Sequence, residues 1–321
     1  NQNTLTINSQ IVDNGAAGAT TALVLSGAGT TVLAPQVANT YTGGTIINGT
    51  TVNTTGAAAV VVIPGNLTLN NATVTMTAAG NLATTSAVTI NGGGSLTLTG
   101  TNSLSSAITF NNTGGNANPT LAVGTQLNLT NNITSNNDSF STFPTISGTL
   151  IDLGAAARTI TTQGLSPVSL VISAPMQNGS LVKDGAGTLS LNAQNTFTGG
   201  VTLNAGSLIL GVSDTLASGV KTTGPLGTGT LSMPNDGVKL VGVSTNVYNP
   251  IAVTNASQTL IVGGVSSNNL TLNGLVTFNG SASNAGTVTV ESPAVVATLG
   301  AAYTGTFALT KTGPGILALS N

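Results

Sequence analysis

The sequence has no cysteine, no histidine and no tryptophan, and these absences exclude several classes of site. Without cysteine the chain cannot form a disulfide framework. Without cysteine or histidine it lacks the usual ligands of zinc, and without histidine it cannot build a serine-histidine-aspartate triad. We therefore expect no metal site, no cofactor and no catalytic centre of these kinds.

Charged residues make up only 4% of the chain, against roughly 25% in an average soluble protein. The net charge is −2, and the basic residues are scattered at Arg158, Lys183, Lys221, Lys239 and Lys311. Nucleic-acid binding needs clustered basic residues, so we do not expect it. Hydrophobic residues reach 40%, too many for a disordered polar segment. No run of about 18 apolar residues predicts a membrane-spanning helix.

The sequence does contain short runs in which apolar and polar residues alternate, most clearly between residues 181 and 211. That stretch reads LVKDGAGTLSLNAQNTFTGGVTLNAGSLILG, with alternating runs at 188–191, 201–203 and 208–210. Alternation with a period of two predicts strands with one buried face, and the Asn, Asp and Gly residues between the runs predict turns. A unit this short cannot bury its apolar face alone, so it must stack on copies of itself.

Two further copies follow the same pattern. Residues 25–55 contain GAGT at 27–30 and NTYTGGTIIN at 39–48, and residues 307–321 contain the first half only. The shared pattern LxKxGxGTLxLxxxNTYTGGTxINxGxLxLG resembles the passenger-associated repeat of bacterial autotransporters. The resemblance implies a right-handed parallel β-helix outside the cell, and it names no ligand.

Strands of three to five residues recur about every eight to twelve residues along the chain, each followed by a turn signal. No segment shows the caps and the 3.6-residue period of a helix. We therefore predict an all-β fold with essentially no α-helix. The spacing alone suits either a sandwich or a solenoid, and the repeat decides for the solenoid. The resemblance implies that this solenoid is a single right-handed parallel β-helix over residues 1–321. Three strands and three turns need roughly 20 to 25 residues, which predicts about 13 to 16 stacked turns. Asn residues at inward turn positions are expected to form hydrogen-bonded ladders.

Three stretches depart from this pattern. Residues 111–119 and 131–144 are the least strand-like, and we predict that the second of these, NNITSNNDSFSTFP, forms a loop excursion from the solenoid wall. Phe140 and Phe143 in this loop either cap a local turn or form a contact patch for a partner. Residues 57–63, AAAVVVI, are wholly apolar and predict a strand that is buried on both faces.

Seven acidic residues are available for chemistry: Asp13, Asp138, Asp152, Asp184, Asp214, Asp236 and Glu291. Glycoside cleavage needs two carboxylates held roughly 5 to 10 Å apart. Only Asp214 and Asp236 are separated by about one turn of the expected solenoid, and both lie in turn-like contexts where Asp is common. Lys183 and Lys311 hold turn positions of the repeat itself. We therefore predict that the chain has no enzymatic activity.

Asn-x-Ser/Thr sequons occur twelve times. A chain this rich in Asn and Thr forms many of them by chance, so they are weak signals for glycosylation. Among them are Asn48, Asn66, Asn128, Asn178 and Asn269.

The two ends of the chain read as parts of one repeat. Joined, they give LALSN followed by NQNTLTIN, where the second copy has LSLNAQNTFTGG. Either the chain is a segment of a longer repetitive protein, or the first strand of one molecule completes the last turn of the next in a head-to-tail fibre. The residues for such self-assembly are Asn1, Gln2, Asn3, Thr4, Leu5, Leu317, Leu319 and Asn321. Because the chain begins without a methionine, we expect that a signal peptide preceded it.

These features predict a non-enzymatic structural protein that is secreted or exposed on a bacterial cell surface. One form of this hypothesis is a self-assembling filament of a biofilm matrix, whose partner is another copy of the chain. A second is an autotransporter passenger that acts as a stalk or as an adhesin toward surface glycans or other cells. A third, a polysaccharide-binding or polysaccharide-degrading β-helix, is disfavoured because sugar sites use aromatic platforms and aromatic residues are only 3% of the chain. We also expect tolerance of acid, since few groups titrate between about pH 3 and 9.

Overall fold

The computed structural model describes residues 3–15, 18–263, 268–278, 286–304 and 308–320, and the chain divides into two compact units at residues 154 and 155. Within these ranges the regular elements are all β-strands, and none is a helix. In each unit, parallel strands stack turn upon turn as a β-solenoid, which confirms the predicted fold class. That residues 1–321 form one continuous right-handed coil stays a prediction. No helix in the described part of the chain is long and apolar enough to cross a membrane.

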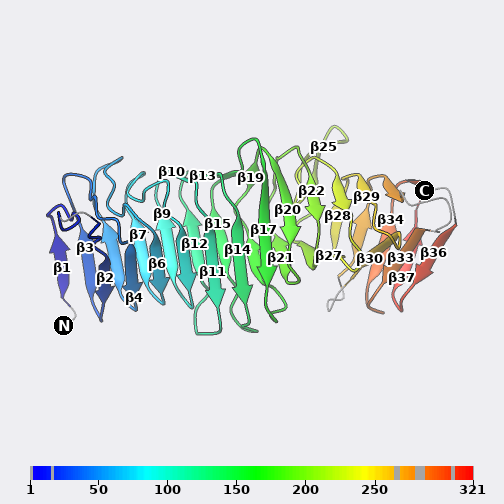
Figure 1. The fold of residues 1–321 in the computed structure, drawn as a ribbon. Helices are drawn as coiled ribbons and strands as arrows, with labels where there is room; N and C mark the ends of the chain where they lie inside the picture. Colours follow the sequence, from blue (N-terminus) through cyan, green and yellow to red (C-terminus); the bar gives the residue numbers. More distant parts are fainter. Residues whose placement is uncertain (1–2, 16–17, 264–267, 279–285, 305–307, 321) are drawn as a thin grey trace. The chain divides into compact units, whose positions relative to one another are not determined.

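Unit 1, residues 1–154, has three parallel sheets (Figure 1). The first sheet contains, in order, β1 (Thr4–Ile7), β3 (Thr30–Leu33), β5 (Thr51–Thr54), β7 (Thr73–Met76), β9 (Ser95–Leu98), β12 (Thr120–Val123) and β15 (Thr145–Gly148). The second contains β2 (Leu23–Ser26), β4 (Thr45–Asn48), β6 (Leu67–Asn70), β8 (Val88–Asn91), β11 (Ile108–Asn112) and β14 (Ile133–Asn137). The third contains β10 (Thr101–Leu104), β13 (Gln126–Leu129) and β16 (Ile151–Asp152).

The register of unit 1 places residues of the same kind on top of one another. Thr30 pairs with Thr51, Thr51 with Thr73, and Thr73 with Ser95. The steps between these partners are nearly equal, and each falls within the predicted length of one turn. A constant step keeps every inward side chain over an inward neighbour, because the side chains of a strand alternate between its two faces.

The core of unit 1 is built from columns of these inward side chains. Val52, Val74, Leu96, Leu121 and Ile146 follow one another on the first sheet, and all five are fully buried. Burying an aliphatic side chain of this size stabilises a fold by about 1.5 to 3 kcal/mol relative to exposing it. The alternation read from the sequence therefore places the apolar half of each strand correctly.

A ladder of asparagines runs along the second sheet of unit 1. Each side-chain Nδ2 donates to the Oδ1 of the asparagine one turn before, from Asn70 to Asn48 (2.7 Å), from Asn91 to Asn70 (2.7 Å), from Asn111 to Asn91 (2.9 Å) and from Asn136 to Asn111 (2.8 Å). The predicted ladder is thus present. Its members are half-buried strand residues, however, and not inward residues of turns.

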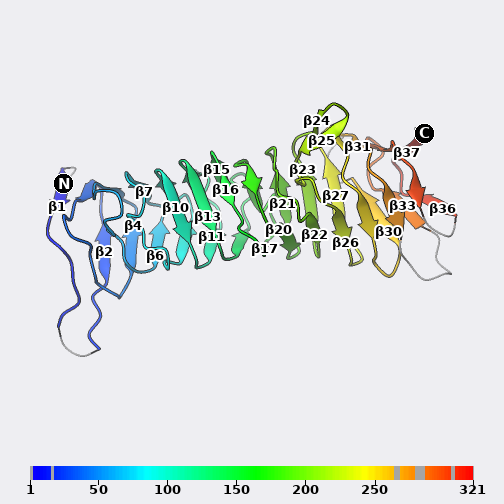
Figure 2. The same ribbon diagram turned by 90° about the horizontal axis from the view of Figure 1, so that it is seen from above.

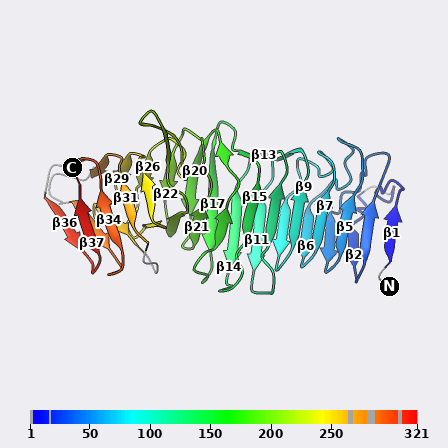
Figure 3. The ribbon, with the colours of Figure 1, turned by 180° about the vertical axis from the view of Figure 1, so that it is seen from behind.

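Unit 2, residues 155–321, repeats the arrangement, and Figure 3 shows its strands from behind. One sheet contains β18 (Leu170–Ile172), β21 (Thr188–Leu191), β23 (Ser207–Leu210), β27 (Lys239–Gly242), β30 (Thr259–Val262), β33 (Gly286–Val290) and β36 (Leu309–Thr312). A second contains β17 (Ala157–Gln163), β20 (Ser180–Asp184), β22 (Val201–Leu203), β26 (Leu231–Met233), β29 (Ile251–Val253), β32 (Val276–Phe278) and β35 (Tyr303–Thr304). A third contains β28 (Thr245–Val247), β31 (Leu270–Leu272), β34 (Val296–Leu299) and β37 (Ile316–Leu319), and β19 spans Met176–Gln177.

The turn length of unit 2 varies more than the sequence predicted. Thr188 pairs with Ser207, a step shorter than the predicted turn, whereas Ser207 pairs with Lys239, a step much longer than it. The long step contains an antiparallel hairpin, β24 (Thr215–Ala217) and β25 (Val220–Thr223), which projects from the stacked strands in Figure 2. The alternation of polar and apolar residues did not predict this hairpin.

The predicted loop excursion at residues 131–144 is wrong for its first half. β14 occupies residues 133–137 and pairs in parallel with β11 along its whole length. The remaining residues form the turn that follows, where Phe140 is exposed and Phe143 is half-buried. Neither aromatic side chain is fully buried. That they cap this turn, or that they contact a partner, stays a prediction.

The predicted strand at residues 57–63 is also wrong. These residues form a turn with only an isolated bridge at Ile63, and Ala59 has a positive φ of 65°. Asn81, a fully buried residue of the next coil, stabilises this turn. Its Nδ2 donates to the carbonyl oxygens of Gly56, Ala57 and Val60 at 3.0 to 3.3 Å. The hydrogen bonds from Asn81 to these backbone carbonyls therefore stabilise a turn, although the apolar composition of the segment predicts a strand.

Candidate functional site

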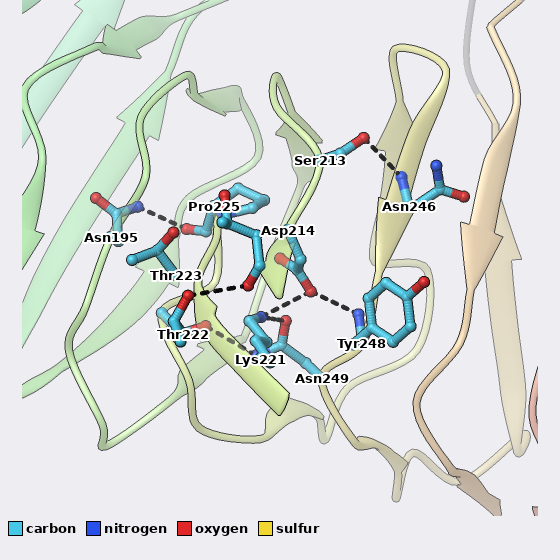
Figure 4. A network of polar contacts seen from close by, with 12 residues as sticks. Asn195, Ser213, Asp214, Lys221, Thr222, Thr223, Pro225, Asn246, Tyr248 and Asn249 are labelled. Atoms are coloured by element: carbon cyan, nitrogen blue, oxygen red, sulfur yellow. Dashed lines mark hydrogen bonds and ion pairs between the residues drawn. The ribbon is translucent and has the colours of Figure 1, made fainter. Parts of the chain in front are cut away.

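A lysine, an aspartate and an asparagine meet at the base of the β24–β25 hairpin (Figure 4). Lys221 lies on β25, Asp214 immediately precedes β24, and Asn249 lies between β28 and β29. Ser218 and Gly219 at the hairpin tip have φ values of 51° and 81°, as a two-residue type I′ turn requires. This tight turn brings Lys221 back beside Asp214.

Asp214 and Lys221 form an ion pair that is tied to the next turn of the solenoid. Asp214 Oδ2 lies 2.9 Å from Lys221 Nζ and accepts a hydrogen bond of 2.5 Å from the backbone N–H of Tyr248. The backbone N–H of Asp214 donates to the carbonyl of Asn246 at 2.9 Å. Lys221 Nζ also donates to Asn249 Oδ1. The amine therefore contacts a carboxylate and a side-chain amide carbonyl at the same time.

The side-chain amide of Asn249 is fully buried and held in one orientation. Its Nδ2 donates to the carbonyl oxygens of Gly227 at 3.2 Å and Gly229 at 2.6 Å. Because only the NH₂ group of an amide can donate, Oδ1 is the atom that faces Lys221. The amide carbon Cγ is one bond away from the atom that the lysine contacts.

Burial opposes both charges of the ion pair. The side chain of Asp214 is fully buried, and that of Lys221 is 10% exposed. Burial raises the pKa of the Asp214 carboxyl, and the hydrogen bond from Tyr248 and the interactions with Lys221 offset only part of this. Burial also lowers the pKa of the Lys221 amine, against the opposing effect of Asp214. Both shifts favour transfer of the proton from the amine to the carboxyl group.

The backbone at Gly224 closes the site from one side. A Cβ at this position would overlap Asp214 Oδ1 and would lie 3.2 Å from Lys221 Cε, so a larger residue cannot occupy it. Gly224 is fixed there by two backbone hydrogen bonds with Asn195, of 2.9 and 3.1 Å. Asp214 Oδ1 is buried against this backbone, and it has no hydrogen-bond partner in the described part of the chain.

The Lys221 amine contacts both an amide carbonyl and a carboxyl group. These are the three parts of an acyl transfer: a nucleophile, an acyl carbon and a proton carrier. Sequence spacing did not predict this cluster, because it pointed to Asp214 only as a partner of Asp236. Lys221 and Asn249 are 28 residues apart across a turn of unusual length, so no short motif marks them.

The structure does not bring Asp214 and Asp236 together. Asp214 follows the end of β23 and Asp236 precedes the start of β27, and these two strands pair in parallel, so the two carboxylates lie at opposite ends of the pair. Asp236 instead accepts hydrogen bonds from Ser257 Oγ at 2.5 Å and Ser257 N at 3.0 Å. These hydrogen bonds lower the pKa of Asp236.

The asparagine of the NT(Y/F)TGG segment connects three successive turns. Asn39 Oδ1 accepts a hydrogen bond of 2.8 Å from the backbone N–H of Ile11, and its Nδ2 donates to the carbonyl of Val62 at 2.7 Å. The side chain is 3% exposed, so both partners are satisfied away from water. Asn195 holds the same position in the second copy and is fully buried as well.

The first glycine of the segment is required by the close approach of the preceding turn. Gly43 N donates to the carbonyl of Thr21 at 2.9 Å, and Gly199 N donates to the carbonyl of Gly179 at 3.0 Å. A Cβ on either glycine would lie 2.6 Å from that carbonyl oxygen. The signature residues of the repeat are thus engaged in holding turns together.

Lys183, predicted at a turn position, is instead an inward residue of β20 and is fully buried. Its Nζ donates to three backbone carbonyl oxygens, those of Asp184 at 3.0 Å, Gly185 at 2.7 Å and Ala205 at 2.8 Å. Burial lowers the pKa of Lys183 to about 8, and the nearby charge of Asp184 opposes this shift. Lys311 is exposed and donates to the carbonyl of Gly313.

The five predicted glycosylation positions differ in exposure. Asn48 and Asn128 are half-buried, and their side-chain amides hydrogen-bond to side chains of neighbouring turns. Asn66, Asn178 and Asn269 are exposed. Glycosylation stays a prediction, with the exposed three as its better acceptors.

Four of the residues predicted for self-assembly lie on two strands, Thr4 and Leu5 on β1 and Leu317 and Leu319 on β37. Leu5 on β1 is 55% exposed, and Leu319 on β37 is 56% exposed. Asn3 and Thr4 are exposed and Leu317 is half-buried. Asn1, Gln2 and Asn321 lie outside the described residues. Nothing in the structure places a second copy against these strands, and self-assembly stays a prediction.

Unit 2 also has a surface groove of about 540 Å³. Its lining residues are Pro167, Val168, Thr188, Ser207, Ile209, Lys239, Val241, Val243, Gly263 and Glu291. The groove contains one acid, Glu291, which is paired with Lys239 at 2.7 Å. None of its described lining residues is aromatic, so it has neither the paired acids nor the aromatic platform of a sugar-cleaving cleft.

Two segments, residues 23–53 and 181–210, match the family model of the passenger-associated-transport-repeat. They correspond to the predicted copies at 25–55 and 181–211, and they do not include residues 307–321. The structure separates the third copy from the second in another way. In the second copy the Gly-x-Gly turn joins β20, in the second sheet, to β21, in the first sheet. In the third copy it joins β36, in the first sheet, to β37, in the third sheet. No curated protein and no solved structure matches the chain.

Proposed function

We propose that the chain is a non-enzymatic structural module, a passenger-like β-solenoid that is displayed outside a bacterial cell. The observation that carries this proposal is the match of one segment in each unit to the passenger-associated-transport-repeat, with each matched segment built into consecutive turns of a solenoid. The repeat residues are used inside the fold. Its aromatic residues, Tyr41 and Phe197, are fully buried, and its glycines and asparagines bind neighbouring turns.

Cysteine labelling on producing cells tests the extracellular location, because the chain has no cysteine of its own. Leu165 is 78% exposed, so Leu165→Cys introduces one accessible thiol. We expect a membrane-impermeant maleimide to label this variant on intact cells or in the medium. Labelling that requires cell lysis would contradict the proposal.

A matched control shows whether the labelled protein is folded. Leu208 on β23 is fully buried, and a thiol placed there is shielded from the reagent in the native fold. Leu208→Cys should stay unlabelled until the protein is denatured. Equal labelling of both variants under native conditions would show that the exposed thiol reports unfolded chains.

A filament is the finer form of this proposal. In the described residues β1 pairs only with β3, and β36 only with β33, and exposed strand edges with apolar side chains add further strands readily. The proposal is that β1 of one copy pairs in parallel with β36 of another. An autotransporter stalk or adhesin is the alternative, and in that case the same edges would be covered by adjoining parts of a longer chain.

Negative-stain electron microscopy over a dilution series distinguishes these two forms. We expect filaments that shorten on dilution, and that are lost in a Leu5→Lys variant, which places a charge on the exposed edge of β1. Separate particles of one length at every concentration would contradict head-to-tail assembly. They would leave the extracellular location, which the labelling tests, untouched.

A further inference from the structure

We propose that Lys221 and Asn249 become joined by an intramolecular isopeptide bond, with Asp214 as the residue that carries the proton. The three groups are already in contact in unit 2, and Figure 4 shows them around one point between the hairpin and the following turn. No metal, cofactor or oxidant is needed, since the reaction exchanges one amide bond for another.

The geometry meets the first requirement of the reaction, which is contact between the nucleophile and its target. Lys221 Nζ touches the Oδ1 of Asn249, and the electrophilic carbon Cγ is bonded to that oxygen. The carbonyls of Gly227 and Gly229 hold the NH₂ group of the same amide away from the lysine. Held groups of this kind react with effective concentrations far above those in solution.

The surroundings meet the second requirement, a neutral amine. An ammonium group has no lone pair for attack, and a lysine becomes nucleophilic when burial removes its proton. Burial lowers the pKa of Lys221 and raises that of Asp214, so the neutral pair of amine and carboxylic acid gains relative to the ion pair. Asp214 Oδ1, buried and with no partner among the described residues, is free to hold the proton.

The steps balance without an outside reagent. Asp214 accepts one proton from the Lys221 ammonium, and the amine lone pair forms a bond to Asn249 Cγ. Asp214 then relays a proton from the attacking nitrogen to the former amide nitrogen, and the bond from Cγ to Nδ2 breaks with release of ammonia. The products are a secondary amide between the two side chains, one ammonia molecule and a protonated Asp214.

The bond would fix the least regular part of unit 2. It links β25 of the projecting hairpin, which lies within the long step from Ser207 to Lys239, to the segment before β29 in the following coil. A covalent link that closes a loop restricts the unfolded chain, as a disulfide does. The chain has no cysteine with which to form a disulfide, and this link supplies the same constraint.

Mass spectrometry of the purified wild-type chain tests the proposal. We expect an intact mass lower than the sequence mass by one ammonia. Trypsin does not cleave after an acylated lysine, so cleavage at Lys183, Lys239 and Lys311 should release peptide 184–239 linked to peptide 240–311. Linear peptides 184–221, 222–239 and 240–311 would overturn the proposal. They would do so even if the intact mass were low, because asparagine cyclisation also releases ammonia.

Variants assign the roles of the three residues. Lys221→Arg and Asn249→Ala should restore the full sequence mass, because each removes one bonding partner. Asp214→Asn should also restore it while leaving both partners in place, and a branched peptide in this variant would show that Asp214 carries no proton. Lys239→Arg is the matched control, since Lys239 pairs with an acid at the surface, and its mass should stay one ammonia low. The wild-type peptide map decides the matter if a variant fails to fold.

Discussion

Asn39 and Asn195 make the same pair of contacts in the two repeats, each with its amide between the turn before and the turn after. Asn39 accepts from the N–H of Ile11 and donates to a carbonyl 23 residues further on. Asn195 accepts from the N–H of Met176 at 2.8 Å and donates to the carbonyl of Pro225 at 2.7 Å. The turns that these residues bridge differ in length, so the two contacts agree in geometry and not in sequence spacing.

Replacing Asn195 with Ala should destabilise unit 2 by about 2 to 4 kcal/mol, because it leaves two buried backbone groups without partners. Urea denaturation followed by circular dichroism measures the effect. The control is Asn235→Ala, whose side chain is exposed and donates one hydrogen bond to Asn204, and it should cost less than about 1 kcal/mol. An equal loss of stability in the two variants would show that the buried hydrogen bonds of Asn195 contribute no more than the exposed one of Asn235.

Replacing Gly199 with Ala should lower the free energy of unfolding more than replacing Gly237 with Ala, although Gly237 has the backbone conformation that is unfavourable for alanine. A Cβ at Gly199 would lie 2.6 Å from the carbonyl of Gly179, whereas Gly237 has a φ of +77° and open space around it. We expect about 1 to 2 kcal/mol for Gly237→Ala from its left-handed conformation, and a larger loss for Gly199→Ala from the displaced turn. Thermal unfolding of the two variants compares them, and a smaller loss at Gly199 would contradict this account.

The alternation of the sequence predicted strands whose inward residues are apolar, but it missed β14, and the apolar run at residues 57–63 wrongly predicted a strand. β14 has Ile133, Ser135 and Asn137 as its inward residues, so its pattern looked like a loop. Asn137 is nevertheless satisfied inside the fold, where its Oδ1 accepts from Asn112 at 2.9 Å. An alternation rule cannot find such a strand, because its buried polar residues are stabilised by contacts from another turn.

The contacts of the candidate site lie beyond sequence reasoning for a related reason. Lys221 and Asn249 meet only because the hairpin lengthens one turn and folds Lys221 back, and no period relates the two positions. Register could be predicted where successive turns have nearly equal length, as from β3 to β9 in the first sheet of unit 1. The repeat segments could be found because the same turn residues recur in the sequence. The residues of the candidate site occur in one arrangement only, so no repetition marks them.

Acid should weaken the fold only slightly, through carboxylates that accept hydrogen bonds. Hydrogen bonds from Thr21 and Thr42 lower the pKa of Asp13, as those from Ser257 lower that of Asp236. A folded pKa below the unfolded value of 3.8 gives stability that is present above pH 3.8 and lost as pH falls through the folded pKa. We expect circular dichroism at about pH 3 to show an intact fold with a lower urea midpoint than at pH 7, and less of a drop in Asp13→Asn. Loss of the fold near pH 4 would contradict the predicted acid tolerance.

Base should strengthen the fold through Lys183, which stands where the first repeat has Leu25. Burial holds the pKa of Lys183 near 8, below its unfolded value of 10.5, so the unfolded chain binds more protons between these two values. The free energy of unfolding therefore rises with pH across that window, by at most about 3 kcal/mol. The three carbonyl partners of Nζ stabilise the ammonium and reduce this figure.

Urea denaturation at pH 8 and at pH 10.5 tests this, with each variant compared with the wild type at both pH values. Lys183→Leu should lose the rise in stability, because leucine has no group that titrates. The variant should still fold, since the first repeat has leucine at this position, in a strand followed by the same turn, GAG. Lys311→Leu should keep the rise, because Lys311 is exposed. Parallel pH profiles for the wild type and Lys183→Leu would mean that Lys183 stays charged in the fold, with its carbonyl cage outweighing the cost of burial.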